Sequence, residues 1–286
     1  MAQGSCLCGA VTWKASGELT PPSHCHCSMC RKANGAPFVT FTSCAVEDFE
    51  WISGEKNVER YESSPGLVRG FCKTCGSSVP GTTPGNNRVF MPLGCMDEST
   101  GLSDGRHLFV GSKATWHTIA DDLKQHETYP SGPGMHSELP VFESVVLDDP
   151  TPGILRGSCL CDQIKYEVKE PFTVIHNCHC SRCRKARGAA HATNGFVPLD
   201  AVRFLEGEDL IVNFKLPGAK SFGQAFCSNC GSAVPRINKE AKVVGVPLGP
   251  LDDMTDAKPK DHIFVGSMAN WYSIEDDIVQ LKEGSV

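Results

Sequence analysis

The chain has 286 residues, a length that fits either one large domain or two domains of common size. Apolar residues make up 40% of it and charged residues 21%, as in ordinary globular proteins. The net charge of −6 gives nucleic-acid phosphates little to attract, and no run of eighteen apolar residues occurs. Neither a nucleic acid nor a membrane is therefore an expected partner.

The sixteen cysteines are the most informative feature of the composition. The opening segment, MAQGSCLCGA, lacks the basic and apolar regions of a secretory signal, so we expect a cytoplasmic protein. Thiols stay reduced in that compartment, where cysteines more often hold metal ions than form disulfides. The composition thus predicts metal ligands.

The chain repeats itself along its length. Cys6 and Cys8 recur as Cys159 and Cys161, 153 residues later. The segments CHCSMCRKANGA and FCKTCGSSVP recur as CHCSRCRKARGA and FCSNCGSAVP, and HLFVGSKATW recurs as HIFVGSMANW. A period this long indicates a duplicated domain, since solenoid repeats are shorter.

We expect the first domain, copy one, over residues 1–128 and the second, copy two, over residues 154–286. Residues 129–153 contain five prolines and three glycines and are expected to form a linker, within which VFESVVL suits a docked strand. Copy two needs an insertion of two residues, which we expect between Phe214 and Gln224, in a surface loop.

The local patterns within each copy are mostly β. Short alternating or β-branched runs include AVTW, IKYEV, FVTF, RVFMPL and KVVGVPL, and Gly, Pro, Asn and Asp separate them. Short helical turns are expected where RKA follows each CHCSxC and near WHTIADDL and WYSIEDDI. The sequence therefore predicts two mostly-β, zinc-binding domains related by internal duplication.

Fourteen cysteines obey the repeat, seven in each copy. The other two, Cys44 and Cys95, align with Val197 and Pro250 and are expected to be plain buried or surface thiols.

The seven ligands of each copy divide into four and three, because a structural zinc takes four protein ligands and a catalytic zinc takes three. A Cys-x-x-Cys-Gly turn needs a second pair, which the early Cys-x-Cys supplies. The expected four-sulfur sites are Cys6, Cys8, Cys72 and Cys75, and Cys159, Cys161, Cys227 and Cys230. The expected three-sulfur sites are Cys25, Cys27 and Cys30, and Cys178, Cys180 and Cys183.

The sequence is compatible with two kinds of zinc site at each three-cysteine group. The site is either an open catalytic zinc or a second structural zinc closed by a histidine, for which the candidates are His24, His26, His176, His179 and His191. His26 and His179 stand between two ligands, so their rings are expected to point away from the metal. His191 replaces Phe38 and could close the site of copy two while that of copy one stays open.

An open three-thiolate zinc favours one kind of chemistry. Its net charge of about −1 makes it a weaker Lewis acid than zinc held by neutral histidines, but it suits a fourth sulfur, which binds as the thiolate. Because the thiolate is the nucleophile, the residues indicate a thiol substrate that attacks an electrophilic carbon.

The segments GSCLCGAV, CHCSMCRKANGAPF, FCKTCGSSV and HLFVGSKATW resemble the glutathione-dependent formaldehyde-activating enzyme family, which includes the centromere protein V group. The resemblance implies an Mss4-like fold, a structural four-cysteine zinc and a catalytic three-cysteine zinc in each copy, so up to four zinc ions per chain. It implies condensation of glutathione with formaldehyde, formally a carbon–sulfur lyase run in reverse. Cys25, Cys27 and Cys30, and in copy two Cys178, Cys180 and Cys183, would then hold catalytic zinc.

Copy two departs from the family pattern. GAPFVTF becomes GAAHATN, Arg69 becomes Gln224, and Gly9, which suits an unusual backbone angle, becomes Asp162. Copy two therefore has a different pocket, or the copies form one composite site in which the tandem replaces a homodimer. Two alternative functions stay open: thiol addition or elimination on another electrophile, and a non-catalytic zinc-stapled interaction module. Arg31 and Arg184 either contact a glutathione carboxylate, or are solvated or paired within the fold.

Overall fold

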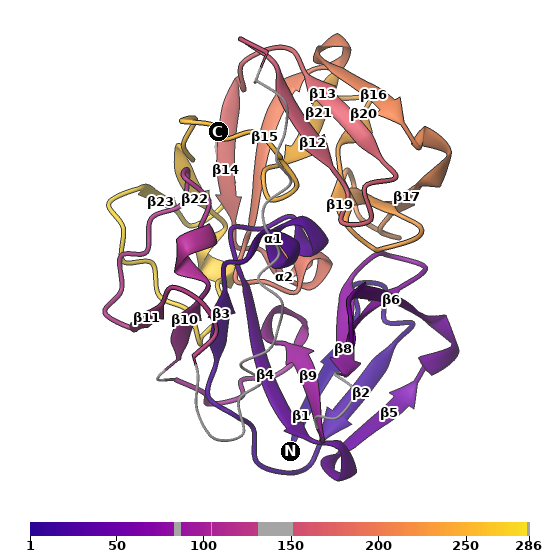
Figure 1. The fold of residues 1–286 in the computed structure, drawn as a ribbon, viewed down its shortest axis with the longest axis vertical. Helices are drawn as coiled ribbons and strands as arrows, with labels where there is room; N and C mark the ends of the chain where they lie inside the picture. The colour runs from indigo at the N-terminus through magenta and orange to yellow at the C-terminus, as the bar shows by residue number, and fades with distance from the viewer. Residues whose placement is uncertain (83–86, 104, 131–150, 285–286) are drawn as a thin grey trace.

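The computed structural model describes residues 1–82, 87–103, 105–130 and 151–284, and over these residues the chain is mostly β (Figure 1). The prediction of a mostly-β fold is confirmed, and two short α-helices lie where the copies meet. The segment VFESVVL lies outside the described residues, as does most of the expected linker. None of the described helices combines the length and the apolar character needed to cross a bilayer.

Copy one contains two antiparallel-rich sheets. The small sheet has the order β1 (Ala2–Ser5), β2 (Thr12–Ala15) and β5 (Phe49–Ser53). The large sheet has the order β11 (Lys124–His126), β10 (Arg106–Leu108), β3 (Ser23–Cys25), β4 (Val39–Ala45), β9 (Arg88–Pro92), β8 (Ser78–Thr82), β7 (Leu67–Cys72) and β6 (Val58–Ser64). Strand β10 runs parallel to both of its neighbours.

Copy two repeats this arrangement with its large sheet divided in two. The small sheet has the order β12 (Leu155–Ser158), β13 (Lys165–Val168) and β16 (Val202–Glu206). A six-stranded sheet has the order β20 (Arg236–Asn238), β21 (Val243–Pro247), β15 (Ala192–Pro198), β14 (Val174–Cys178), β22 (Asp261–Ile263) and β23 (Val279–Leu281). A three-stranded sheet has the order β17 (Ile211–Lys215), β18 (Gly223–Cys227) and β19 (Ala233–Val234). The hairpin loop between β17 and β18 lies within the span expected to hold the two-residue insertion.

The two helices follow the central cysteine motifs. Helix α1 spans Ser28–Asn34 and α2 spans Ser181–Arg187, so each begins before the expected RKA turn. Single 3-10 turns punctuate the strands at Val46–Asp48, Glu55–Asn57, Leu93–Cys95, Val110–Ser112, Leu199–Ala201, Glu208–Leu210 and Val265–Ser267.

The expected helical turns near WHTIADDL and WYSIEDDI lie at the start of these segments: 3-10 turns span Val110–Ser112 and Val265–Ser267, and single hydrogen-bonded turns end at His117 and Tyr272. Beyond these turns both segments are irregular. Trp116 of copy one is only 6% exposed and belongs to the apolar core of copy two, beside residues such as Tyr166 and Val197. Trp271 packs in return against the core of copy one. These contacts with the other copy are encoded by no local pattern in the sequence.

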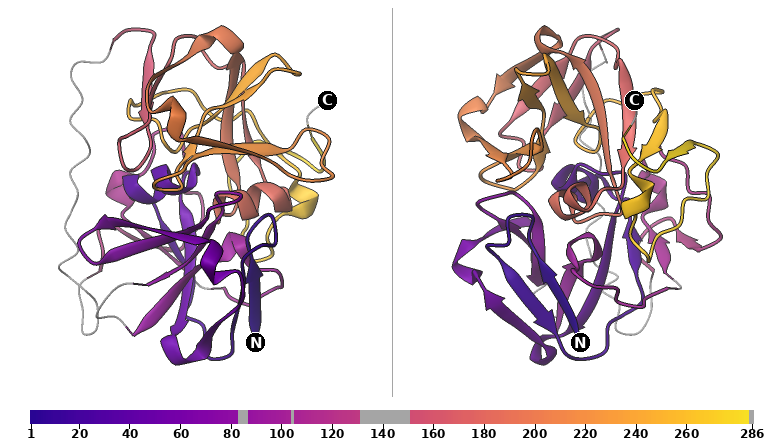
Figure 2. Two further views of the ribbon diagram at one scale, coloured as in Figure 1. Left: turned by 90° about the vertical axis from the view of Figure 1, so that its right-hand side faces the viewer. Right: turned by 180° about the vertical axis from the view of Figure 1, so that it is seen from behind.

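The interface between the copies is reciprocal, as in a two-fold dimer (Figure 2). The Lys32 ammonium binds Asp252 and, at 2.5 Å, the Ser158 hydroxyl of copy two. The equivalent Lys185 binds Asp97 and the Ser5 hydroxyl of copy one.

Close backbone approach at two glycines accompanies these pairs. A Cβ at Gly94 would lie 2.3 Å from the backbone N of Ala189, and a Cβ at Gly249 would lie 2.4 Å from the carbonyl O of Arg31. Larger residues at either glycine would push a helix of the other copy away. The first cysteine turn keeps a left-handed residue in both copies, with φ of 74° at Gly9 and 60° at Asp162, as the sequence predicts.

The exchanged tryptophans make the stability of copy two depend on copy one. We expect Trp116→Ala to lower the free energy of unfolding by about 3–5 kcal/mol, because the change leaves a cavity in a packed core. Amide exchange should then accelerate in β14, β15 and β21 of copy two more than in β4 and β9. The matched control is Ile52→Ala, at a side chain 49% exposed, and equal effects of the two changes would contradict the exchange of tryptophans.

Candidate metal centres and active site

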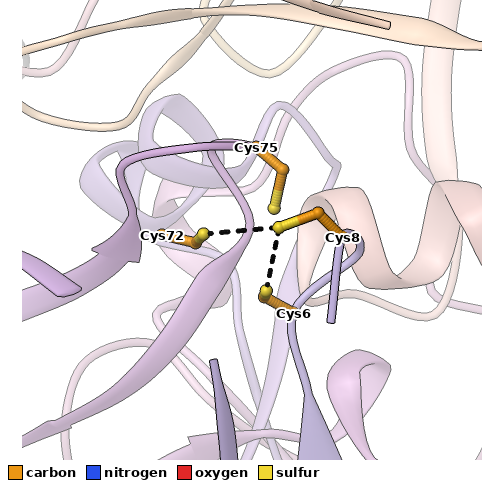
Figure 3. Close-up of side chains that lie close together, drawn as sticks. All are labelled: Cys6, Cys8, Cys72 and Cys75. Carbon is orange, nitrogen blue, oxygen red and sulfur yellow. Dashed lines mark hydrogen bonds between the residues drawn. The ribbon is translucent and has the colours of Figure 1, made fainter. Parts of the chain in front are cut away.

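Each copy brings four thiols together from two distant segments, and Figure 3 shows the group of copy one. In copy one the sulfurs of Cys6, Cys8, Cys72 and Cys75 all lie within 4.8 Å of one another. The Cys6 and Cys8 sulfurs are 3.5 Å apart, and the Cys8 and Cys72 sulfurs are 3.8 Å apart. The matching group in copy two joins Cys159, Cys161, Cys227 and Cys230.

These separations fit a tetrahedral metal. Zinc–sulfur bonds of about 2.3 Å in a tetrahedron place the sulfurs roughly 3.8 Å apart. In copy two the Cys159–Cys161 and Cys161–Cys227 sulfur separations are 3.3 and 3.7 Å. All sixteen cysteines are free thiols, so each group offers a complete set of soft donors to one ion.

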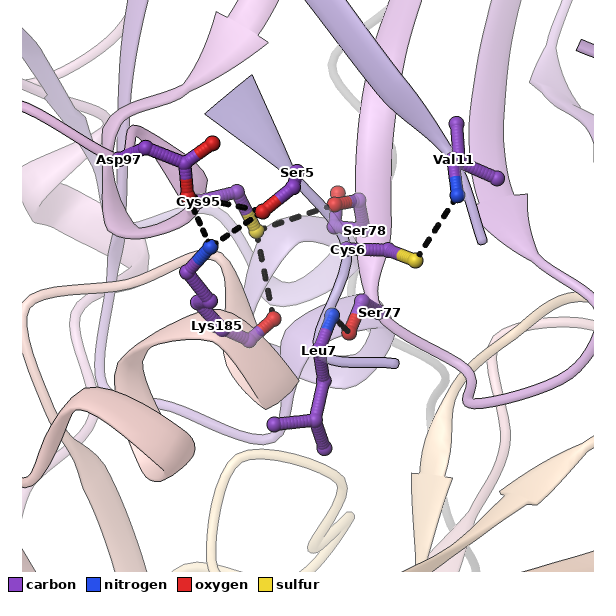
Figure 4. A network of polar contacts seen from close by, with 9 residues as sticks. All are labelled: Ser5, Cys6, Leu7, Val11, Ser77, Ser78, Cys95, Asp97 and Lys185. Atoms are coloured by element: carbon purple, nitrogen blue, oxygen red, sulfur yellow. Dashed lines mark hydrogen bonds and ion pairs between the residues drawn. The ribbon is translucent and has the colours of Figure 1, made fainter. Parts of the chain in front are cut away.

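Backbone N–H groups support the sulfur groups (Figure 4). Val11 donates to the Cys6 sulfur at 3.3 Å, and Leu7 donates to the Ser77 hydroxyl at 3.0 Å, which ties the first cysteine turn to the second. Ile164 and Leu160 make the equivalent bonds in copy two, to the Cys159 sulfur and the Ser232 hydroxyl. Equivalent backbone hydrogen bonds therefore hold the four-sulfur group in place in both copies.

The two cysteines outside the repeat lie elsewhere. Cys44 and Cys95 are fully buried in the apolar core of copy one and belong to no sulfur group. The Cys95 thiol lies 3.2 Å from the Lys185 carbonyl O of copy two and 3.2 Å from the Ser78 carbonyl O, so it contributes to the interface (Figure 4).

The central motifs form two three-thiol groups. The sulfurs of Cys25, Cys27 and Cys30 lie within 4.8 Å of one another, and so do those of Cys178, Cys180 and Cys183. No further His, Cys, Asp or Glu of the described residues joins either group. The donor sets suit the same soft metal as the four-thiol groups but leave one tetrahedral position without a protein ligand.

Helix capping shapes each three-thiol group. Cys27 is the N-cap of α1, and its sulfur accepts a hydrogen bond from the Cys30 N–H at 3.3 Å. The helix ends at Gly35, whose N–H donates to the Arg31 carbonyl. Cys180 caps α2 in the same way and accepts from the Cys183 N–H. One helical turn therefore presents two of the three sulfurs on the same side.

Arg69 contacts the three-thiol group of copy one. Its two terminal nitrogens each lie 3.7 Å from the Cys30 sulfur, and its Nε donates to the Ser63 hydroxyl at 2.9 Å. Hydrogen bonds from Cys25 and Cys27, together with the Arg69 charge, hold the pKa of the Cys30 thiol well below its usual range. The Cys30 thiol therefore ionises readily even without a bound metal.

A cavity of about 380 Å³ opens beside these thiols. The cavity is lined by Cys25, Cys27, Cys30 and Arg69, together with apolar side chains such as Phe41 and Phe109. Cys230 and Gly231 of copy two complete its wall, so the copies share this cavity. Its volume is typical of small-molecule sites.

A chain of polar side chains holds the loop between the first two ligands. The His26 Nε2 lies 2.8 Å from the His107 Nδ1, and the His107 Nε2 lies 3.0 Å from an Asp121 carboxylate oxygen. Copy two repeats the chain with His179, His262 and Asp276 at 2.8 and 3.1 Å. Burial lowers the pKa of His262, so near pH 7 its neutral ring donates to Asp276 and accepts from His179.

The histidines do not complete the three-thiol groups. The rings of His26 and His179 point to their histidine partners, as expected from their positions between ligands. The idea that His191 closes the site of copy two is not supported: His191 packs against His179 and Tyr272 at the interface. The side chain of His24 is hydrogen-bonded to Thr40, and that of His176 to Asp261.

The arginines next to the third cysteine do not line the cavity. Burial lowers the pKa of Arg31 and of Arg184, and both belong to the helices at the interface. The cavity instead contains Arg69, Arg88 and Arg106. Sequence reasoning missed the last two, because they stand far from any cysteine motif; their only signal was replacement by Val243 and Asp261 in copy two.

Comparison with known proteins places this arrangement in a family. The model of the glutathione-dependent formaldehyde-activating enzyme family matches residues 1–112 and 154–267, which is most of the chain. The chain belongs to this family. The match occurs once in each copy, in agreement with the duplication.

Two curated relatives match shorter stretches. An uncharacterized lyase of Schizosaccharomyces pombe is 39% identical over 90 residues, 31% of this chain and 64% of that protein. A candidate glutathione-dependent formaldehyde-activating enzyme of Halomonas elongata is 31% identical over 86 residues, 28% of this chain and 54% of that protein. The matches thus span between half and two thirds of each relative. A crystal structure of a Rhodobacter sphaeroides protein aligns with 24% identity over 34% of this chain and 90% of that one, with a TM-score of 0.30.

The four-thiol groups give the first prediction for this region. We expect Cys72→Ser to remove about one metal ion per chain and to lower the thermal unfolding midpoint, because ligands this distant meet only in the folded chain. Mass spectrometry for metals and calorimetry would measure both effects. Cys44→Ala is the control, since Cys44 is equally buried but belongs to no group. Unchanged metal content in Cys72→Ser would contradict the assignment.

His191 predicts a pH-dependent stability. Burial, with His179, His117 and His262 nearby, holds its pKa well below the ordinary value of 6.5, so only the unfolded chain takes up its proton near pH 6. Stability is therefore present above pH 6.5 and is lost as the pH falls toward the folded pKa. Relative to His191→Phe, the wild type should lose about 1.4 kcal/mol between pH 7.5 and 5.5 in urea titrations. A difference that does not change with pH would refute this account.

Proposed function

We propose that this chain is a zinc-dependent carbon–sulfur lyase, acting also as a synthase, on glutathione or another thiol and a small aldehyde such as formaldehyde. One observation carries the proposal: the thiols of Cys25, Cys27 and Cys30 open on the shared cavity without a fourth protein ligand among the described residues. Membership of the family and the lyase name of one relative support it.

The metal in this proposal is zinc. Cys25, Cys27 and Cys30 would hold it in copy one, and the corresponding thiols in copy two, while the two four-thiol groups would hold structural ions. When bound to such a site, zinc lowers the pKa of a thiol ligand so that it stays a thiolate at neutral pH. This gives up to four ions per chain, and reduced thiols of this number suit the cytoplasm.

The residues of the cavity position the reactants. Arg69 places a positive charge 3.7 Å from the Cys30 sulfur, which offsets the negative charge that a substrate thiolate adds. Apolar walls, including Phe41 and Leu108, exclude water around the aldehyde. In the reaction the substrate sulfur forms a bond to the carbonyl carbon, the carbonyl π pair moves to oxygen, and the thiol proton ends on that oxygen.

The duplication has a role in this proposal. The reciprocal lysine pairs and exchanged tryptophans give the tandem the features of a two-fold dimer, and we propose that it replaces a homodimer. The changed lining of copy two favours a second candidate function for that copy, in which a thiol is added to or eliminated from a different electrophile.

Exchange NMR with labelled formaldehyde and glutathione tests the proposal. The zinc-loaded protein should accelerate adduct formation over the spontaneous reaction. Cys27→Ser removes a metal ligand and should lower the acceleration by at least the roughly 10- to 100-fold that loss of an outer-shell partner causes. Cys44→Ala should behave as the wild type, because its thiol lies outside all four groups. A wild-type rate equal to the spontaneous rate would refute the proposed reaction.

A further inference from the structure

The cavity of copy one has an unusual charge. Three arginines line it, Arg69, Arg88 and Arg106, and none of the described residues in its wall carries a carboxylate. Beside them the wall is mainly apolar, with Phe41, Phe90 and Leu67 among its side chains. A ligand that fills this space meets positive charge that no carboxylate among the described wall residues balances.

The three arginines differ in their contacts with the described residues. Arg69 contacts the Cys30 sulfur, and Arg88 donates to the Ser43 hydroxyl at 2.8 Å and to the Ser43 carbonyl at 2.9 Å. Arg106 has no side-chain hydrogen bond or ion pair to any residue that the structure describes, and it stands beside Ser23 in the parallel pair of β10 and β3. An unpaired guanidinium in a cavity wall is a ready partner for a carboxylate.

Copy two has lost all three charges, and in two places their partners have changed with them. The Arg106 and Ser23 positions hold Asp261 and His176, whose side chains bind each other at 2.5 Å. The Arg88 and Ser43 positions hold the apolar Val243 and Phe196.

At the third position, Arg69 is replaced by Gln224, whose amide donates to the Cys75 carbonyl of copy one. Copy two keeps positive charge near its thiols, but on helix α2: Arg182 lies 5.4 Å from the centre of the Phe222 ring. The positions that correspond to the cavity arginines therefore no longer offer a cationic site.

We propose that copy one alone binds an anionic thiol, and that Arg69, Arg88 and Arg106 select it through its carboxylate groups. The proposal rests on the proposed function for the position of the sulfur. Three thiolates around a divalent ion already carry a net charge of about −1, so a thiol that also bears carboxylates needs nearby cations. The arginine set supplies them in copy one, and Gln224, Val243 and Asp261 do not in copy two.

Calorimetry on the zinc-loaded full chain tests the assignment with two probes, glutathione and its diethyl ester, whose carboxyl groups are uncharged. We expect one glutathione per chain. Arg106→Gln should weaken glutathione binding about tenfold or more, the scale of a charge-assisted hydrogen bond, and should leave binding of the diester unchanged. Arg69→Gln should weaken binding of both probes, and that of glutathione more, because Arg69 also lies beside the Cys30 sulfur. Arg60→Gln, a control on the exposed face of β6, should bind both probes as the wild type does.

Two glutathione molecules per chain, or equal weakening for both probes, would overturn the assignment. So would the absence of any glutathione binding. Turnover is measured separately by exchange NMR, so the two proposals fail in different ways. Arginine-dependent binding without accelerated adduct formation refutes only the proposed reaction, and accelerated adduct formation that ignores the carboxyl charge refutes only the arginine assignment.

Discussion

The closing of four sulfurs around one point is the constraint on which the rest of each copy depends. Cys6 and Cys8 come from a turn at the start of the chain, and Cys72 and Cys75 come from the end of β7 and the turn after it. A group that spans more than sixty residues fixes the small sheet against the large sheet. The group also places Phe71 and Gly76, the neighbours of Cys72 and Cys75, in the wall of the cavity.

Within that frame the three-thiol group is held from two sides. The helix cap orders Cys27 and Cys30, and the chain from His26 through His107 to Asp121 ties the intervening loop to β10. Asp121 follows shortly after Trp116, whose side chain packs in the core of copy two. The polar chain and the segment from Trp116 to Asp121 therefore connect the ligand loop of copy one to the core of copy two.

The sequence predicts the parts that depend on spacing and misses the parts that depend on long-range packing. The mostly-β fold, the duplication, the left-handed turn at Gly9 and the short helix after each central motif follow from local patterns. The exchange of Trp116 and Trp271 does not, since it depends on contacts with the other copy that no local pattern encodes. Arg88 and Arg106 could not be found from motifs, because the sheet order alone brings β9 and β10 to the cysteines.

The histidine chains show which differences between the copies are compatible with the fold. His26 and His179, His107 and His262, and Asp121 and Asp276 are the same in both copies, whereas the cavity arginines are not. A change in the histidine chain would disturb the ligand loop and, through the segment from Trp116 to Asp121, the core of the other copy. A change in a cavity wall affects only what binds there, and the paired replacements around Asp261 and Val243 leave no buried charge unsatisfied. Because Cys230 and Gly231 of copy two form part of the cavity wall of copy one, copy two contributes to that site even where its own binding residues differ.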